Sequence, residues 1–386
     1  MKNISYQPNL QEKTRKNETV ICVSFKYKDT EIRDKNKVCH EPITCVVRKK
    51  ESKKIITRED GGEYTYKSLE RATTPGESKG EKEIDPFTHH FFFPCWWWIK
   101  TIVLGVFLIP VRIFLCSVLC LINILIALVV SGFWDPGPEK PHQGWTKQMA
   151  DLTYRIGNLM VGCAGIRVQL SGCAQDSRAR ILVAAPHTSY LDTLLVGRTG
   201  ATAVVAAEFS VSCLGVVGNF IRTIWVNRET IESRRYSLDS IISRAQDPSW
   251  PQVLIFPEGT TTNGQALLKF KPGAFLPRVP IQPITIHWEN RFNTITWTYQ
   301  QNISAPILLF LTLATPVTNC RIHFHPTLYP DLQDTQNTQD TQDTQDTQDI
   351  HIFAERTRRL MAESLGVPLS NLSGKDAYQK YIKNKK

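Results

Sequence analysis

The chain has 386 residues, a formal net charge of +10, ten cysteines and a mean hydropathy of −0.22. Hydrophobic residues make up 42% of it, which excludes a wholly disordered chain. The cysteine spacings are irregular and form no CxxC pair or His/Cys cluster, which excludes a secreted disulfide scaffold and a zinc module. The basic charge indicates an anionic partner, which can be a membrane surface, a phosphate-bearing ligand or nucleic acid.

Residues 1–85 carry mixed charges and no long apolar run, and we interpret them as a polar, largely disordered N-terminal tail. Two short apolar runs, at 20–23 and 43–47, allow short strands as an alternative. We expect no signal peptide, because the first long apolar run begins near residue 101.

Residues 86–134 combine an aromatic belt with an apolar run. Aromatic side chains gather between 87 and 98, and such side chains favour the headgroup level of a bilayer. The following stretch contains an uncharged segment, 113–132, that is long enough to span the hydrocarbon core as a helix. Two arrangements remain open: a single transmembrane helix, or a helical hairpin bent at Pro110 with Arg112 reaching to the interface.

Residues 135–330 alternate short apolar runs with helical patterns. The patterns predict helices at 148–161, 191–195 and 231–245, and strands at 166–170, 181–185, 201–206, 224–226, 253–256 and 281–287. This alternation is typical of an α/β domain, and we expect a mixed sheet flanked by helices. The membrane-embedded helix or hairpin and the polar tail precede it.

Residues 331–349 are a low-complexity Asp-Thr-Gln repeat with no residue able to form a core, and we expect a solvated loop. Residues 350–386 contain an amphipathic helix at 352–365, stopped by Gly366 and Pro368, and a basic tail.

Polar residues follow directly after the strand predicted at 181–185. His187 and Asp192 are five positions apart, so they meet only if His187 lies in the turn and Asp192 in the first helical turn. Asp192 then fixes the tautomer of His187 and leaves its other nitrogen as a general base. Ser189 is a rival nucleophile, although it lacks a Gly-x-Ser-x-Gly elbow.

Two further strand ends carry candidate binding residues. Glu258, Gly259 and Thr260 follow the strand at 253–256, where small and polar residues let a polar headgroup or an oxyanion approach. Arg228 follows the strand at 224–226 and can clamp a phosphate.

These segments together resemble the four-motif signature of the glycerolipid acyltransferase superfamily, of the acylglycerol-phosphate acyltransferase type. The motifs are His-x4-Asp at 187–192, a Gly…Arg stretch ending at Arg228, Phe-Pro-Glu-Gly-Thr at 256–260 and Val-Pro-Ile-Gln-Pro at 279–283. Further segments, among them 85–89, 233–235, 250–252, 270–275, 294–297 and 359–362, are similar to the lysophosphatidylcholine acyltransferase branch. The EF-hand-like region usual in that branch does not follow, so calcium regulation is not implied.

The resemblance implies acyl transfer from acyl-CoA to a lysophospholipid, with His187 and Asp192 catalytic and Arg228, Glu258, Gly259, Thr260 and Lys271 binding substrate. Thr261 stands where enzymes acting on lysophosphatidate typically carry an Arg, which favours lysophosphatidylcholine as acceptor. We expect no metal and no cofactor, acyl-CoA as co-substrate, a bilayer as partner and no nucleic acid. By the same resemblance we expect the endoplasmic reticulum membrane, with the catalytic domain facing the cytosol.

Two alternatives differ in class. One is an enzyme of the same fold that acts on lysophosphatidate or another lysophospholipid. The other is a non-catalytic, lipid-binding membrane protein.

Overall fold

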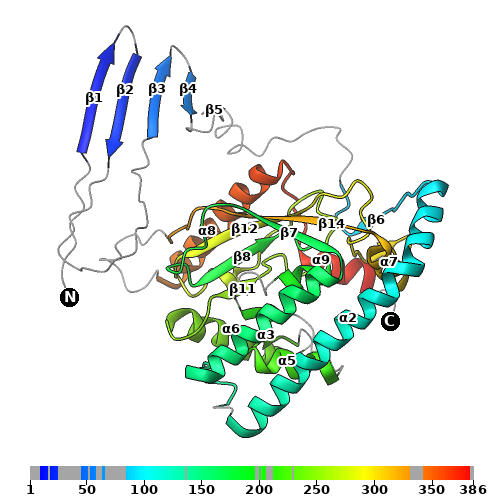
Figure 1. The fold of residues 1–386 in the computed structure, drawn as a ribbon. Coiled ribbons are helices and arrows are strands. Elements are labelled where there is room, and N and C mark those ends of the chain that lie inside the picture. Colours follow the sequence, from blue (N-terminus) through cyan, green and yellow to red (C-terminus); the bar gives the residue numbers. More distant parts are fainter. Residues whose placement is uncertain are drawn as a thin grey trace, which may run out of the picture. The chain divides into compact units, whose positions relative to one another are not determined.

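The computed structural model describes strands β1–β5 and residues 84–382, apart from 135–136, 196–199, 201, 206–211, 228–229 and 331–341. The chain divides into two compact units, Met1–Lys82 and Glu83–Lys386. Figure 1 shows the elements of both units.

The first unit contains a five-stranded antiparallel sheet in the order β1-β2-β3-β4-β5. Its strands are β1 (Asn9–Arg15), β2 (Glu18–Ser24), β3 (Cys45–Lys50), β4 (Lys53–Thr57) and β5 (Glu63–Thr65). Strands β2 and β3 include residues 20–23 and 45–47 of the two short apolar runs. The disorder of the tail stays a prediction.

The second unit is built on a seven-stranded mixed sheet in the order β10-β9-β11-β8-β12-β14-β7. Its strands are β7 (Ile166–Gly172), β8 (Ile181–Ala185), β9 (Thr202–Val205), β10 (Ile224–Trp225), β11 (Val253–Ile255), β12 (Ile281–Trp288) and β14 (Thr318–Phe324). Strand β14 runs antiparallel to β12, and the other pairs are parallel. A short separate pair joins β6 (Thr88–His89) to β13 (Gln300–Gln301).

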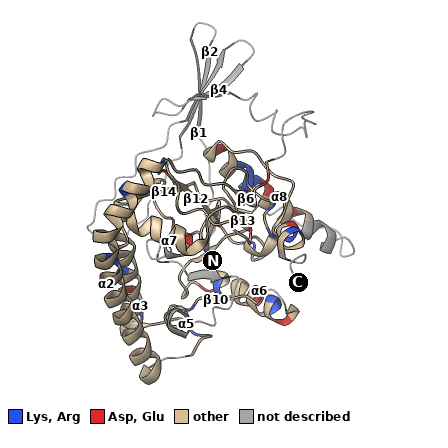
Figure 2. Cartoon of the chain, turned by 90° about the vertical axis from the view of Figure 1, so that its right-hand side faces the viewer, with Lys and Arg blue, Asp and Glu red and all other residues tan. Residues whose placement is uncertain are grey.

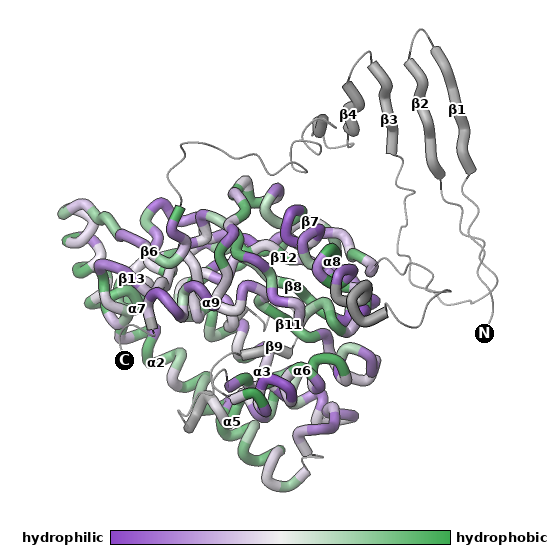
Figure 3. The backbone as a smooth tube through the Cα atoms, turned by 180° about the vertical axis from the view of Figure 1, so that it is seen from behind, coloured by the Kyte–Doolittle hydropathy of each residue, from purple (hydrophilic) through white to green (hydrophobic). Residues whose placement is uncertain are grey.

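Helices α3 (Gly144–Cys163), α6 (Ile231–Gln246) and α8 (Gln342–Leu365) pack against this sheet, which confirms the predicted fold class. Helices α5 (Ser212–Phe220) and α7 (Ala305–Ala314) pack against the helix of residues 95–134. The remaining elements are helix α9 (Gly374–Ala377) and the short helices η1 (Tyr190–Leu195), η2 (Pro272–Ala274) and η3 (Tyr378–Ile382). Every residue of β8 is buried, and two apolar clusters lie on opposite sides of it: Ile181, Val183 and Ala185 belong to one, Leu182 and Ala184 to the other. Figure 3 shows this central part of the sheet in green.

The apolar run forms one helix, α2 (Cys95–Trp134). Within the part of the chain that the structure describes, it is the one helix long and apolar enough to cross a membrane. It continues through Pro110, so the hairpin bent at that residue is wrong. Proline removes one backbone hydrogen bond, but packing against α3, α5 and α7 supports the helix along its length. Figure 2 shows α2 beside α3, coloured tan over most of its length.

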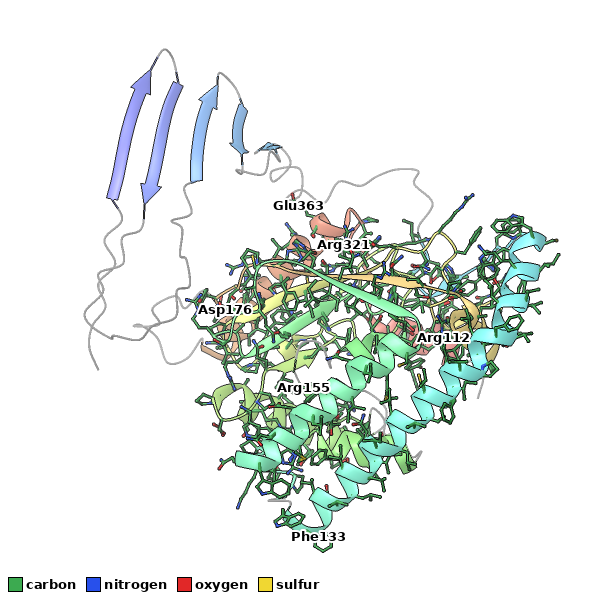
Figure 4. The ribbon with its side chains drawn as sticks, viewed as in Figure 1. Arg112, Phe133, Arg155, Asp176, Arg321 and Glu363 are labelled. Carbon is green, nitrogen blue, oxygen red and sulfur yellow. The ribbon has the colours of Figure 1, made fainter. Side chains whose placement is uncertain are left out.

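Arg112 does not reach to a membrane interface. It is 8% exposed and donates hydrogen bonds to the backbone carbonyls of Leu313, Thr315 and Pro316, at 2.7, 2.7 and 2.6 Å. Figure 4 labels it on α2, near α7. The last carbonyls of a helix lack intrahelical partners, so Arg112 caps α7. This correction follows from a tertiary contact that a hydropathy pattern does not contain.

The C-terminal segment closes onto the start of the second unit. The Asp85 carboxylate accepts hydrogen bonds from Lys380 Nζ at 2.7 Å and from the Tyr381 hydroxyl at 2.8 Å. Helix α8 begins at Gln342, inside the Asp-Thr-Gln repeat, and not at residue 352. Extending a helix adds one hydrogen bond per residue once a packed turn exists, so a polar repeat can lengthen it without forming a core.

Candidate active site

The His187 turn lies where β8 ends, and Asp192 lies in η1, the next element of the chain. His187 Nδ1 is 3.1 Å from Asp192 Oδ2, so the structure brings the two predicted residues together. A carboxylate oxygen opposite Nδ1 favours the tautomer of the neutral imidazole that carries its proton there, and in that tautomer Nε2 has a lone pair. The imidazole stacks on Phe256 with 4.3 Å between ring centroids, which fixes its plane.

Asp192 is almost completely buried, at 1% exposed. Its Oδ2 also accepts the backbone N–H groups of Thr188 and Ser189, at 2.7 and 2.8 Å. Its Oδ1 accepts the indole N–H of Trp288, at 3.0 Å. These three donors and His187 Nδ1 therefore hold the carboxylate in one orientation. Trp288 was not predicted, because it follows Asp192 by almost a hundred positions in the sequence.

The Glu258 side chain accepts hydrogen bonds from the backbone of two loops. It is 0% exposed, and its two oxygens accept the N–H groups of His187 and Leu268, at 2.8 and 3.0 Å. Burial raises the pKa of Glu258 to about 7. These contacts give Glu258 a positioning role for the His187 turn, and the predicted direct contact with substrate stays a prediction.

Gly259 closes the turn that begins at Phe256, because its N–H donates to the Phe256 carbonyl at 3.1 Å. Its φ is +64°, and a Cβ there would lie 2.5 Å from Lys271 Nζ, so Gly259 leaves room for the Lys271 side chain. The Thr262 N–H donates to the His187 carbonyl at 2.8 Å, and the Thr260 hydroxyl lies 2.7 Å from the Tyr299 hydroxyl. The structure thus places Lys271 against Gly259, and Thr262 joins this segment to His187.

The backbone amides near His187 differ in their partners. Those of His187, Thr188 and Ser189 are used by the two buried carboxylates. Those of Thr260 and Thr261 have no acceptor within the described residues, although both residues are buried. Buried amides normally have partners, so these two are candidates for binding an oxygen of a ligand.

Arg228, the residue predicted to bind a phosphate, lies outside the described residues. Strand β10, which ends shortly before it, is separated from β8 by β9 and β11 in the sheet. No group of three or more His, Cys, Asp and Glu side chains able to hold a metal occurs among the residues that the structure describes.

The sequence matches known proteins over this same region. Residues 167–287 match a family model described as Acyltransferase. The chain is 35% identical over 331 residues to the lysophosphatidylcholine acyltransferase of Drosophila melanogaster, a match that covers 83% of this chain and 57% of the relative. The chain belongs to the glycerolipid acyltransferase superfamily, and it falls in the lysophosphatidylcholine acyltransferase branch.

A second relative of this branch is lysophosphatidylcholine acyltransferase 1 of Homo sapiens. It is 34% identical over 297 residues, which cover 76% of this chain and 53% of the relative. The chain therefore spans a little over half the length of these curated acyltransferases. A solved structure, the 1-acyl-sn-glycerophosphate (LPA) acyltransferase PlsC from Thermotoga maritima, matches with a TM-score of 0.45 and 16% identity, over 71% of this chain and 100% of that one.

Proposed function

We propose that the protein transfers an acyl group from acyl-CoA to the free hydroxyl of a lysophospholipid at a membrane. The observation that carries this proposal is the His187–Asp192 contact at 3.1 Å, which leaves Nε2 of His187 free as a base. The names of the relatives support a lysophospholipid as acceptor.

Nε2 of His187 takes the proton of the lysophospholipid hydroxyl, and the alkoxide oxygen attacks the thioester carbon of acyl-CoA. The carbonyl oxygen becomes an oxyanion, which the free amides of Thr260 and Thr261 are suited to bind. Collapse of this intermediate breaks the carbon–sulfur bond. The CoA thiolate then takes the proton from His187, which restores the free base and releases CoA as the thiol.

Lysophosphatidylcholine suits this site as the acceptor. Thr261 cannot supply the bidentate clamp that an Arg gives a phosphate monoester, while Lys271 beside Gly259 supplies a single charge suited to a diester. The rings of Tyr190 and Trp297 pack edge to face, with 4.8 Å between their centroids and 89° between their planes, and Tyr190 is 49% exposed. Aromatic faces attract quaternary ammonium groups, which a choline headgroup carries.

Helix α2 supports attachment to a membrane. Most of its exposed side chains are large and apolar, including Ile102, Phe107, Phe114 and Leu125. Both of its ends are tied to the same unit: Asn302 bonds both the N–H and the carbonyl of Phe91, at 2.8 Å each, and α3 and α5 pack against the helix. These contacts support placing residues 84–94 and the catalytic residues on one side of the bilayer. We propose the cytosolic face of the endoplasmic reticulum, where acyl-CoA is available.

An acceptor panel tests the proposal. Microsomes containing the chain receive one acyl-CoA and, in parallel, lysophosphatidylcholine, lysophosphatidylethanolamine or lysophosphatidate. We expect the highest kcat/KM with lysophosphatidylcholine, and a loss of about 10²–10⁴-fold for His187→Ala. The matched control is His351→Ala, an exposed residue on α8. Full activity of His187→Ala contradicts the mechanism, and a preference for lysophosphatidate contradicts the acceptor.

A further inference from the structure

Trp288 is the last residue of β12, and the sheet brings it to the edge where the His187 turn lies. Strand β12 pairs in parallel with β8, with Thr285 opposite Ala185. Parallel neighbours end at the same edge of a sheet, so the residues that follow each pairing lie near one another. The Trp288 indole N–H reaches Oδ1 of Asp192 at 3.0 Å.

The two carboxylate oxygens of Asp192 differ in the number of hydrogen-bond donors that face them. Oδ2 faces His187 Nδ1 and two backbone amides, whereas Oδ1 has Trp288 as its one hydrogen-bond donor among the described residues. A buried carboxylate that loses a donor has an unsatisfied oxygen and is freer to rotate. Rotation of Asp192 disturbs its contact with Nδ1 of His187.

We propose that Trp288 is a positioning residue of the reaction: its indole N–H holds Asp192 oriented, and through Asp192 it keeps Nε2 of His187 in place as the base. This inference rests on the proposed function. Trp288 acts through Asp192 and touches no reacting atom.

Three titratable groups lie around Asp192. His187 faces Oδ2, and Glu258 accepts the His187 backbone N–H. Cys320 on β14 lies opposite Trp288, and burial, together with the charge of Asp192, raises the pKa of its thiol. Removing the indole N–H leaves Oδ1 of Asp192 without its donor, so the orientation of His187 should suffer and kcat should fall while KM changes little.

Two substitutions separate the N–H from the bulk of the side chain. Trp288→Phe keeps an aromatic ring and removes the donor. Trp288→His loses the second ring but keeps an N–H, at Nε2, in the ring position that Nε1 occupies in tryptophan. Trp250→Phe, at a buried tryptophan that stacks on Arg244, is the control for loss of an indole elsewhere.

The measurement is kcat and KM for both substrates between pH 5.5 and 9, in microsomes. We expect Trp288→Phe to lower kcat about 10- to 100-fold, as for loss of a hydrogen bond to a charged group. Its KM values should change less than about threefold, and Trp288→His should recover part of kcat. Trp250→Phe should keep the wild-type kcat.

An unchanged kcat in Trp288→Phe overturns the inference. It is also overturned if Trp288→His loses as much kcat as Trp288→Phe, because packing and not the N–H is then what matters. If Trp288→Phe does not fold, a kcat of Trp288→His within about 10-fold of wild type supports the inference, and a loss of about 100-fold or more overturns it. An inactive wild type overturns the proposed function itself, so the two failures are distinguishable.

Discussion

The carboxylate of Glu258 accepts the backbone N–H of His187 at 2.8 Å, from a position with no exposure to solvent. Its second oxygen accepts the N–H of Leu268, so one side chain joins two loops beneath the candidate base. An acidic residue in an enzyme motif is readily taken for a substrate ligand. Here its contacts support the backbone of the candidate base.

Glu258→Gln should lower kcat because the amide NH₂ cannot accept a hydrogen bond. One of the two backbone N–H groups then faces a donor and loses its partner, which displaces the His187 turn or the Leu268 loop. We expect kcat to fall about 10-fold or more and KM to change little. Steady-state kinetics in microsomes measure this. A variant with wild-type kcat and a raised KM would instead indicate direct contact with the acceptor.

Glu258 should also make stability depend on pH. Burial raises its pKa from 4.5 to about 7, so between these values the native state holds a proton that the unfolded state has released. This stabilising contribution is complete below about pH 4.5 and is lost as the pH rises through 7. Between pH 5 and pH 8, the melting temperature in detergent should fall more for the wild type than for Glu258→Gln. Equal falls in melting temperature would show that Glu258 is not the group responsible.

Gly259→Ala should disturb Lys271. The new Cβ would lie 2.5 Å from Nζ, in a backbone conformation with φ of +64° that alanine adopts at a cost of about 1–2 kcal/mol. We expect a higher KM for the lysophospholipid and a lower melting temperature. Gly273→Ala is the matched control, because a Cβ there meets no atom within 4 Å and its φ is not positive. Equal kinetics for the two variants would mean that the close approach of Lys271 has no role.

Arg112→Leu should destabilise the second unit. It removes donors from three carbonyls at the end of α7, and the cost should be about 2–4 kcal/mol, as for buried groups left without partners. Urea unfolding in detergent measures it, and Lys100→Leu, at an exposed position of the same helix, is the control. A loss in Arg112→Leu no larger than in the control would show that the cap contributes nothing.

The four Asn-x-Ser/Thr sites, at Asn3, Asn17, Asn302 and Asn371, test the orientation. If the residues before α2 and those after it both face the cytosol, none of the four receives a glycan. Expression in mammalian cells with and without endoglycosidase treatment should give bands of equal mobility, beside a known glycoprotein that shifts. A shift that Asn371→Gln abolishes would place the catalytic unit in the lumen.

Hydrophobic patterns in the sequence predicted the central strands of the sheet. Continuous apolar runs predicted β8 and β11, because strands buried on both faces need no alternation. Helix α7 and strand β14 were missed. The apolar run of α7 is too short for its period to distinguish a helix from a strand. Pro306 is compatible with a helix because it lies in the first turn, and the sequence alone does not show where that turn begins.

The site was predictable only where its residues are close in sequence. His187 and Asp192 share one loop, so their spacing was enough to suggest that they meet. Trp288 comes from another strand, and only the order of the sheet brings it to Asp192. The role of Arg112 likewise depends on where α7 ends, which neither the charge nor the hydropathy of α2 specifies.

Helix α2 carries two separate sets of constraints along one apolar sequence. Its buried face includes Gly105, where a Cβ would lie 3.1 Å from the Cβ of Ala314, so a larger side chain on this face collides with α7. Its exposed residues, such as Phe107 and Leu125, need only remain hydrophobic. Among relatives, substitutions should therefore be frequent on the exposed face of this helix and rare on the buried face, with a period of 3.6 residues.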